Sequence, residues 1–229
     1  MNATINGISS MATRQILAEL CHAYEQRTEQ PVTIESIGGV DAVKRIRAGE
    51  AFDLVVLADD VMRQLEADNL LKPGSRRSFA TSAMAVAVRA DANHPDLTSE
   101  ESVKAAILAA RSIGFSTGPS GTHLINLLKT WGIEQAVSER LVKASPGVPV
   151  GTLVARGEAE LGFQQLSELL DVPGTEIAGP LPAAVQLVTL FSCGVCAQAS
   201  GAARTRDLIA YVTSGEADAP KRRHGMEPA

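Results

Sequence analysis

The segment PVTIESIGGVDAVKRIRAGEAFDLVVLA, residues 31–58, decides the fold class of this chain. Its first seven residues are rich in β-branched side chains and predict a strand over 31–37. Residues 41–49 predict a helix that Gly49 ends. Residues 52–58 form a continuous apolar run, as in strands that are buried on both faces of a sheet. Strand, helix and strand in this order are typical of a parallel sheet with helices on its faces.

The same alternation of strands and helices continues on both sides of this segment. A strand over 3–8 and a serine-capped helix precede it, and a strand over 80–88 follows it. In a second alternation, SERLVKA (138–144) predicts a helix and DVPGTE (171–176) predicts a turn. A long extended stretch over 183–199 and a last helix end the pattern. We therefore expect two α/β units joined by two long strands that could serve as a hinge.

The expected domain boundaries follow from these two strands. The first lobe comprises residues 1–82 plus 190–229, and the second lobe, inserted into the first, comprises 83–189. The polar stretch DANHPDLTSEE contains a proline and is typical of a link between such units. A chain of 229 residues is long enough for two small lobes of this kind.

The composition of the chain excludes several classes of function. Hydrophobic residues make up 45% and charged residues 21% of the sequence, which is an ordinary globular balance. A net charge of −5 and an aromatic content of 3% argue against a nucleic-acid partner. No apolar run reaches the length of a membrane span. An anion bound by this acidic chain must therefore be held locally, by backbone amides or a few polar groups.

Four turns share one design, in which a strand leads through small or hydroxyl residues into a helix. They lie at 8–10, 37–40, 116–122 and 146–152. In a parallel α/β sheet such turns meet at the carboxyl edge, where ligands bind. Helix N-termini at that edge carry N–H groups without intrahelical partners and about half a positive charge. Each turn alone is equally well explained as a structural loop, but the set of four predicts an anion site in a cleft between the lobes.

Four segments carry a resemblance to a known family: ATINGISSMATRQILAELCHAYEQRTEQPVTIES, GGVDAVKRIRAGEAFDLVVLADDVMRQL, GVPVGTLVARGEAELGFQQLSELL and the final GMEPA. On these segments the chain resembles the molybdate-binding protein family, within the type 2 periplasmic binding protein fold. The resemblance implies an α/β fold with two Rossmann-like lobes joined by two crossing strands. It also implies a monomeric solute-binding protein of the periplasm, with an ABC transporter permease as partner if the protein is exported. The N-terminal residues do not read as a secretory signal, so a cytoplasmic location stays open.

The resemblance also implies which residues contact the ligand. Ser9 and Ser10 match the first loop, and the second loop falls at 38–40, where molybdate binders usually carry a serine and this chain has none. For that reason, and because the turn GPSGTHL is rather polar, we expect a polycarboxylate or a phospho-acid rather than molybdate. The candidate ligand-binding residues are Ser9, Ser10, Gly38, Gly39, Val40, Ser82, Gly118, Ser120, Gly121, Thr122, Val148, Val150 and Gln164.

An enzyme is the alternative function, because the lobes also resemble an aconitate isomerase branch of this family. That activity moves a proton across the allylic system of a tricarboxylate and needs a general base beside an anion cradle. His123, which follows the GPSGT turn, is the candidate base, although a solvent-facing residue in the first helical turn is the simpler interpretation. Asp59 and Asp60 are explained by helix capping. The pair Arg76–Arg77 could clamp a carboxylate, but a solvated charge pair is the simpler interpretation.

Neither a metal nor another cofactor is expected. Cys193 and Cys196 form a C-x-x-C inside an apolar run, with no second pair, so we interpret them as small residues of a buried strand. Cys21 does not complete a zinc site with them, and the remaining histidines have no clustered partners. The turn GPSGTH lacks the Gly-Lys-Ser/Thr ending of a phosphate-binding P-loop.

Overall fold

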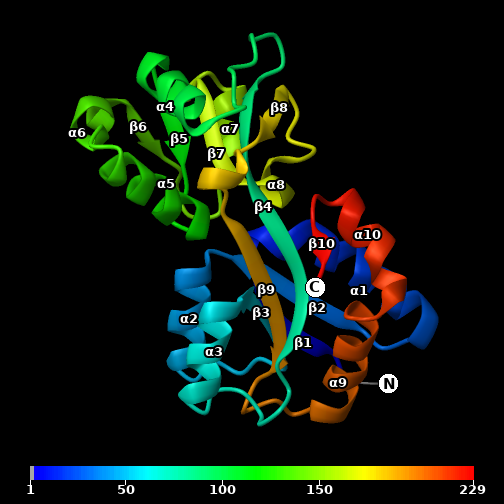
Figure 1. Ribbon diagram of the computed structural model, residues 1–229. Helices are drawn as coiled ribbons and strands as arrows, with labels where there is room; N and C mark the ends of the chain where they lie inside the picture. The colour runs from blue at the N-terminus through cyan, green and yellow to red at the C-terminus, as the bar shows by residue number, and fades with distance from the viewer. Residues whose placement is uncertain (1–2) are drawn as a thin grey trace. The chain divides into compact units, whose positions relative to one another are not determined.

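The chain folds into two compact units in the computed structural model, which describes residues 3–229 (Figure 1). Unit 1 comprises the chain up to Ser82 together with Thr189–Ala229, and unit 2 comprises Ala83–Val188. The chain leaves unit 1 within β4 (Arg77–Arg89) and returns to it at the start of β9 (Val188–Val195). The two long strands expected from the sequence are therefore the segments that connect the units.

Unit 1 is built on a sheet in the order β2-β1-β3-β9-β4. β1 (Ile5–Ser10), β2 (Val32–Ile37) and β3 (Leu54–Ala58) are parallel, and β9 runs antiparallel to β3. The short β10 (Glu227–Pro228) pairs with β4. Every residue of β3 is buried, because this strand has a neighbour on each edge and helices on both faces. The carboxyl ends of the parallel strands meet at one edge of the sheet, where the first two predicted turns begin.

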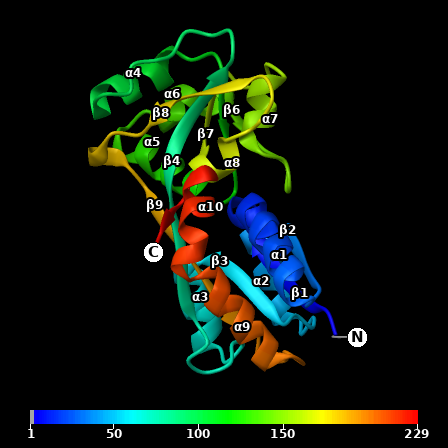
Figure 2. The same cartoon turned by 90° about the vertical axis from the view of Figure 1, so that its right-hand side faces the viewer.

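Helices cover both faces of the unit 1 sheet (Figures 1 and 2). On one face, α2 (Gly39–Arg47) and α3 (Asp59–Ala67) bury Ile46 and Met62 in one apolar cluster. On the other face, α1 and α9 share a second apolar cluster with the strands. The elements on that face are the 3-10 turn η1 (Met11–Thr13), α1 (Arg14–Thr28), α9 (Ala202–Val212), the 3-10 turn η4 (Gly215–Ala217) and α10 (Asp218–Arg223).

Unit 2 contains the strand order β4-β7-β5-β6, and β8 (Thr175–Pro180) also pairs with β4. β5 (Ile113–Phe115) lies parallel to β6 (Leu141–Lys143) and to β7 (Leu161–Gln165). Its helices and 3-10 turns are α4 (Glu100–Ala109), α5 (Pro119–Thr130), α6 (Glu134–Val137), η2 (Ser138–Arg140), α7 (Val150–Ala155), α8 (Leu166–Leu169) and η3 (Ala183–Val185). No helix within residues 3–229 is long and apolar enough to cross a membrane.

One local expectation from the sequence is wrong. The helix expected over 138–144 is a single 3-10 turn followed by β6, whose residues pair one by one with β5. The ladder formed with β5 decides this conformation, and local propensity does not report that partner. The turn expected over 171–176 is present and leads into β8. The extended stretch expected over 183–199 begins with η3 and contains β9.

Candidate anion-binding site

The first predicted loop of unit 1 begins inside the sheet. β1 extends through Ser9 and Ser10, so neither serine precedes the helix as a hydrogen-bonding cap. Ser9 is fully buried, and its Oγ lies 2.8 Å from Oγ of Ser36, its partner in the parallel β1–β2 register. The half-buried Ser10 lies nearer the loop, and its Oγ is 3.5 Å from Oγ1 of Thr13. Ser10 is therefore better placed to meet a ligand than Ser9.

Sequence reasoning missed Ser36 and Thr13, which complete this group of hydroxyls. Ser36 stands opposite Ser9, and Thr13 is buried and donates to the carbonyl oxygen of Ser10 over 3.1 Å. The sequence gives no clear signal for Ser36, because aligning the ends of the predicted strands over 3–8 and 31–37 places it opposite Gly7, whereas β1 extends to Ser10 and pairs Ser9 with Ser36. The Thr13 contact depends on the 3-10 turn that follows β1, which the sequence did not indicate.

The second loop brings backbone amides to the start of α2. Gly38 precedes the helix with φ −59° and ψ 135°, and a β-carbon on Gly39 would meet no heavy atom within 4 Å. The carbonyl oxygen of Gly38 accepts from the N–H groups of Asp41 and Ala42. The N–H groups of Gly39 and Val40 precede these two and belong to the helix positions that lack an intrahelical acceptor. Open space at Gly39 thus lies next to amides that an anion can use.

Ser82 has a structural partner in unit 1. It lies on β4, is 1% exposed, and donates from Oγ to the carbonyl oxygen of Gly225 over 3.2 Å. This contact joins β4 to the segment before β10.

The loop before α5 in unit 2 folds tightly on itself. Oγ of Ser116 accepts from the N–H of Gly118 over 3.3 Å and lies 3.4 Å from Oγ of the buried Ser120. A β-carbon on Gly121 would lie 1.7 Å from the carbonyl oxygen of Ser116, so glycine is required there by the protein's own backbone. The N–H of Thr122 donates to the carbonyl oxygen of Gly118, which leaves Ser120 and Gly121 as the amide donors at this helix start.

The loop before α7 uses its amides internally, against the expectation from the sequence. The N–H of the buried Val150 donates to Oε1 of Gln164 over 2.7 Å, and Nε2 of Gln164 donates to Oε1 of Glu168 over 2.7 Å. The N–H of Val148 donates to the carbonyl oxygen of Ser145. The N–H groups of Val148 and Val150 therefore already donate to acceptors within unit 2, and for Val150 this acceptor is the side chain of Gln164.

His123 is held by one ring nitrogen. Its Nε2 lies 2.8 Å from the carbonyl oxygen of Val185, and the side chain is half-buried at the start of α5. A carbonyl oxygen can only accept, so Nε2 carries the hydrogen and Nδ1 carries the basic lone pair of the neutral ring. Any base chemistry by this residue must therefore use Nδ1.

Asp59 and Arg76 form a structural ion pair. Oδ1 of Asp59 lies 2.6 Å from Nη1 of Arg76 and accepts from Oγ of Ser192 over 2.5 Å, while Nε of Arg76 contacts Glu66 over 2.8 Å. Burial raises the pKa of Asp59, but the hydrogen bonds from Ser192 and Arg76 outweigh it and leave this pKa below its usual value. The guanidinium of Arg76 is thus bound by two carboxylates, which makes it unsuited to clamp a ligand. The interpretation of Arg76 and Arg77 as a solvated pair of charges does not apply to Arg76 either.

The cysteines are inert thiols in this fold. All three are buried and unlinked, and burial raises the pKa of each thiol to about 12. Within residues 3–229, no three histidine, cysteine or acidic side chains gather as they would around a metal ion.

Comparison with known proteins agrees with this architecture. A family model described as bacterial extracellular solute-binding protein matches residues 5–227. An aconitate isomerase from Pseudomonas sp. is 32% identical over 232 residues, covering 98% of this chain and 88% of that protein. The periplasmic molybdate-binding protein of Azotobacter vinelandii aligns with a TM-score of 0.82 at 20% identity, over 97% of this chain and 98% of that one. The binding protein AgtB of A. tumefaciens R10, solved in complex with agropinic acid, aligns with a TM-score of 0.77 at 14% identity, over 100% and 83%.

The chain therefore belongs to the family of bacterial extracellular solute-binding proteins. Its fold is the two-lobed α/β fold of periplasmic binding proteins, which confirms the fold class predicted from the sequence. The resemblance to the molybdate-binding proteins is likewise confirmed. Proteins of this family bind small ligands and typically work in the periplasm.

Proposed function

We propose that this protein binds a small polycarboxylate or phospho-acid, with aconitate as the first ligand to test. The observation that carries the proposal is the start of α2, where open space at Gly39 adjoins the N–H groups of Gly39 and Val40. Ser10 adds a hydroxyl group from the neighbouring strand of unit 1, and these donors replace water around the bound acid. In unit 2, the N–H groups of Ser120 and Gly121 are a second set of donors at the start of α5.

A carboxylate fits this proposal better than molybdate. The second loop offers two glycines and a valine, so its donors are amides without an added hydroxyl. Losing one donor from a desolvated oxyanion costs about 1–3 kcal/mol, which a larger acid offsets with contacts to its other groups. The 32% identical relative, named an aconitate isomerase, supports a tricarboxylate as that acid.

Thermal unfolding with a panel of anions tests the binding proposal. The panel comprises cis-aconitate, trans-aconitate, citrate, phosphoglycerate, molybdate and sulfate. A ligand present at 100 times its Kd should stabilise the protein by about 2.7 kcal/mol, and we expect this for at least one polycarboxylate or phospho-acid. The proposal would be overturned if none of these anions changed the melting temperature, or if molybdate alone raised it.

Two glycine substitutions make the test specific to the α2 loop. Gly39→Ala places a methyl group in the open space and should weaken binding at least tenfold. Gly215→Ala is the matched control, since a β-carbon there also meets nothing within 4 Å and the residue lies in η4. Equal affinities of the two variants would show that the α2 loop does not bind the ligand.

An isomerase is the second candidate function. A base would take a proton from the methylene carbon beside the double bond of aconitate, the double bond would shift, and a proton would return to the former vinylic carbon. The aconitate isomerase relative favours this reaction, and Nδ1 of His123 is the nitrogen with a lone pair to serve as base.

NMR spectra of cis-aconitate incubated with the protein decide on this candidate. We expect conversion by the parent protein and a loss of at least a hundredfold in His123→Ala. His94→Ala is the control, because His94 forms only an exposed pair with Glu176. No conversion by the parent protein would eliminate the reaction, and equal conversion by His123→Ala would remove His123 as the base.

Location and partners follow from the family in this proposal. We infer that the protein works in the periplasm as a monomer. If it does not catalyse the isomerase reaction, it delivers its ligand to an ABC permease. Fractionation of the native cells tests the location, and light scattering of the purified protein tests the oligomeric state. A cytoplasmic protein, or a stable dimer, would contradict the inference.

A further inference from the structure

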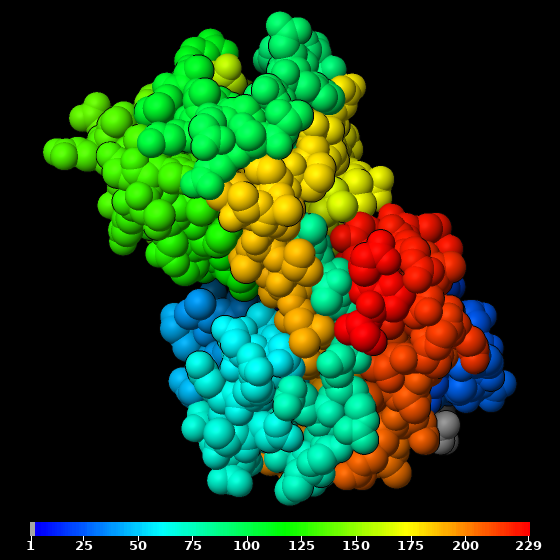
Figure 3. All heavy atoms as spheres, in the orientation of Figure 1, coloured from blue at the N-terminus to red at the C-terminus, as the bar shows by residue number. Residues whose placement is uncertain are grey.

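A small pocket of unit 1 lies between α9 and the loop that precedes β4. Its volume is about 160 Å³, and its walls include Ser75 from the loop, Arg77 at the start of β4, Arg206 from α9 and Thr213 at the end of that helix. Arg206 and Thr213 are seven residues apart, which places them on the same face of the helix. Figure 3 shows the loop beside α9 at the surface of the unit. These residues are separate from the loops that begin at the carboxyl ends of β1 and β2.

The charge of this pocket is unbalanced. Both charged residues in its walls are arginines, in a chain whose net charge is −5. None of the ion pairs formed within residues 3–229 uses Arg77 or Arg206. Two guanidinium groups that share one small pocket repel each other. An anion bound between them would attract both and offset this repulsion.

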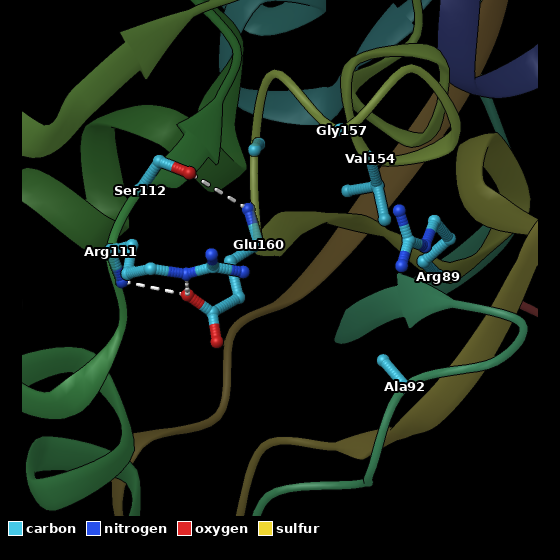
Figure 4. A pocket seen from close by; sticks show the side chains of 8 residues that line it. Arg89, Ala92, Arg111, Ser112, Val154, Gly157 and Glu160 are labelled. Carbon is cyan, nitrogen blue, oxygen red and sulfur yellow. Dashed lines mark hydrogen bonds and ion pairs between the residues drawn. The ribbon is translucent and has the colours of Figure 1, made fainter.

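A larger pocket of unit 2 shows the contrast (Figure 4). Its volume is about 380 Å³, and Arg89 and Arg111 lie in its walls. Arg111 contacts Glu160 over 3.1 Å, and Arg89 contacts Asp91 over 2.5 Å, so each guanidinium already has a carboxylate partner. In the unit 1 pocket, by contrast, neither arginine forms an ion pair with a carboxylate of the described residues.

The wall of the unit 1 pocket is preorganised. Nη1 of Arg77 donates to the carbonyl oxygens of Gly74 and Arg76 over 2.9 and 2.8 Å, which fixes the side chain and leaves its other N–H groups for a ligand. The buried Ser75 accepts from the N–H of Val195 over 3.1 Å and anchors the loop to β9. Thr213 donates its hydroxyl hydrogen to the carbonyl oxygen of Ile209. The donors offered to a ligand are therefore the two guanidinium groups.

We propose that this pocket binds a tetrahedral oxyanion such as phosphate or sulfate, held by Arg77 and Arg206. Guanidinium groups match such oxygens with paired N–H donors. A volume of about 160 Å³ is well above the roughly 10–15 Å³ that one bound water needs, so the pocket has room for a tetrahedral anion. This anion would tie α9 to the loop before β4 and stabilise unit 1.

Isothermal titration of the full chain with inorganic phosphate at pH 8 tests this site. We expect one phosphate per chain, with sulfate competing for it. Arg206→Gln should raise the Kd at least tenfold, and Arg206→Lys should fall between it and the parent protein, because lysine keeps the charge and loses the paired donors. Arg206 is exposed, so neither substitution threatens the fold.

Two control variants separate this site from other sources of binding. Arg222→Gln removes the same charge from an exposed ion pair of unit 1 and should leave the Kd unchanged. Arg47→Gln should also leave it unchanged, because Arg47 forms an exposed ion pair with Asp68 and does not line the pocket. The proposal is overturned by an absence of phosphate binding, by an equal affinity for chloride at the same ionic strength, or by an Arg206→Gln variant that binds phosphate as tightly as the parent protein.

Discussion

Replacing Gly121 with alanine should destabilise unit 2 through a collision within its own backbone. The new β-carbon would lie 1.7 Å from the carbonyl oxygen of Ser116 and 2.7 Å from the carbonyl carbon. Both partners are backbone atoms, so no side-chain rotation relieves the contact, and the separation must open to about 3.0 Å. The start of α5 has to move away from the loop that β5 leads into, which also disturbs the buried Ser120.

The expected loss is about 3 kcal/mol in the free energy of unfolding. Inserting one carbon into a well-packed site typically costs about 1–3 kcal/mol, and this site is at the upper end because the backbone itself must shift. For a chain of this size, that loss corresponds to a decrease in Tm of roughly 6–12 °C.

Urea unfolding followed by tryptophan fluorescence measures the loss. Trp131 is the only tryptophan of the chain and directly follows α5, so its emission reports on unit 2. Gly118→Ala is the matched control, because a β-carbon there meets only Oγ of Ser116, at 3.6 Å, and its stability should change by less than about 0.5 kcal/mol. A loss below about 1 kcal/mol for Gly121→Ala, or equal losses for both variants, would refute the reasoning.

Asp59→Asn should cost about 1–3 kcal/mol at pH 7, because it removes the carboxylate that Arg76 contacts. The pKa of Asp59 is lowered on folding, so its stabilisation is full above the unfolded pKa of about 4 and disappears as the pH falls through the folded value. Urea midpoints of parent and variant should therefore converge as the pH falls below the unfolded pKa, and a difference that does not depend on pH would contradict this. Gln164→Leu should cost about 1–3 kcal/mol in thermal unfolding, since the buried N–H of Val150 loses its acceptor, and an unchanged Tm would count against that role. The three cysteines should resist iodoacetamide at pH 8 in the folded protein and react fully in urea, and mass spectrometry showing rapid labelling of the folded chain would contradict their burial.

Much of the fold could be predicted from the sequence, because its signals are local and repeated. The apolar run before Asp59 reads as a strand buried on both faces, and β3 is buried along its whole length. The alternation of strands and helices was sufficient for an α/β fold of two units, and family resemblance added the two-lobed architecture. Residues 138–144 were predicted wrongly because β6 is only three residues long and exists through its pairing with β5.

The candidate site could be predicted only as a set of loops. The sequence located Gly39 and Ser120 at helix starts, since small and hydroxyl residues follow each strand there. It could not show that the amide of Val150 is occupied by Gln164, because that contact needs the packing of α7 against β7. It likewise missed Ser36, whose role comes from its register opposite Ser9.

By itself, the sequence determined which segments become strands and helices and which loops carry small residues, because periodicity, apolar runs and turn chemistry act between near neighbours in the chain. The tertiary structure alone decided which donors those loops keep for a ligand. Hydrogen bonds and close contacts are set by atoms that meet across elements, as Gly121 meets Ser116 and Asp59 meets Arg76. An amide is available to an anion only when no such internal partner reaches it first.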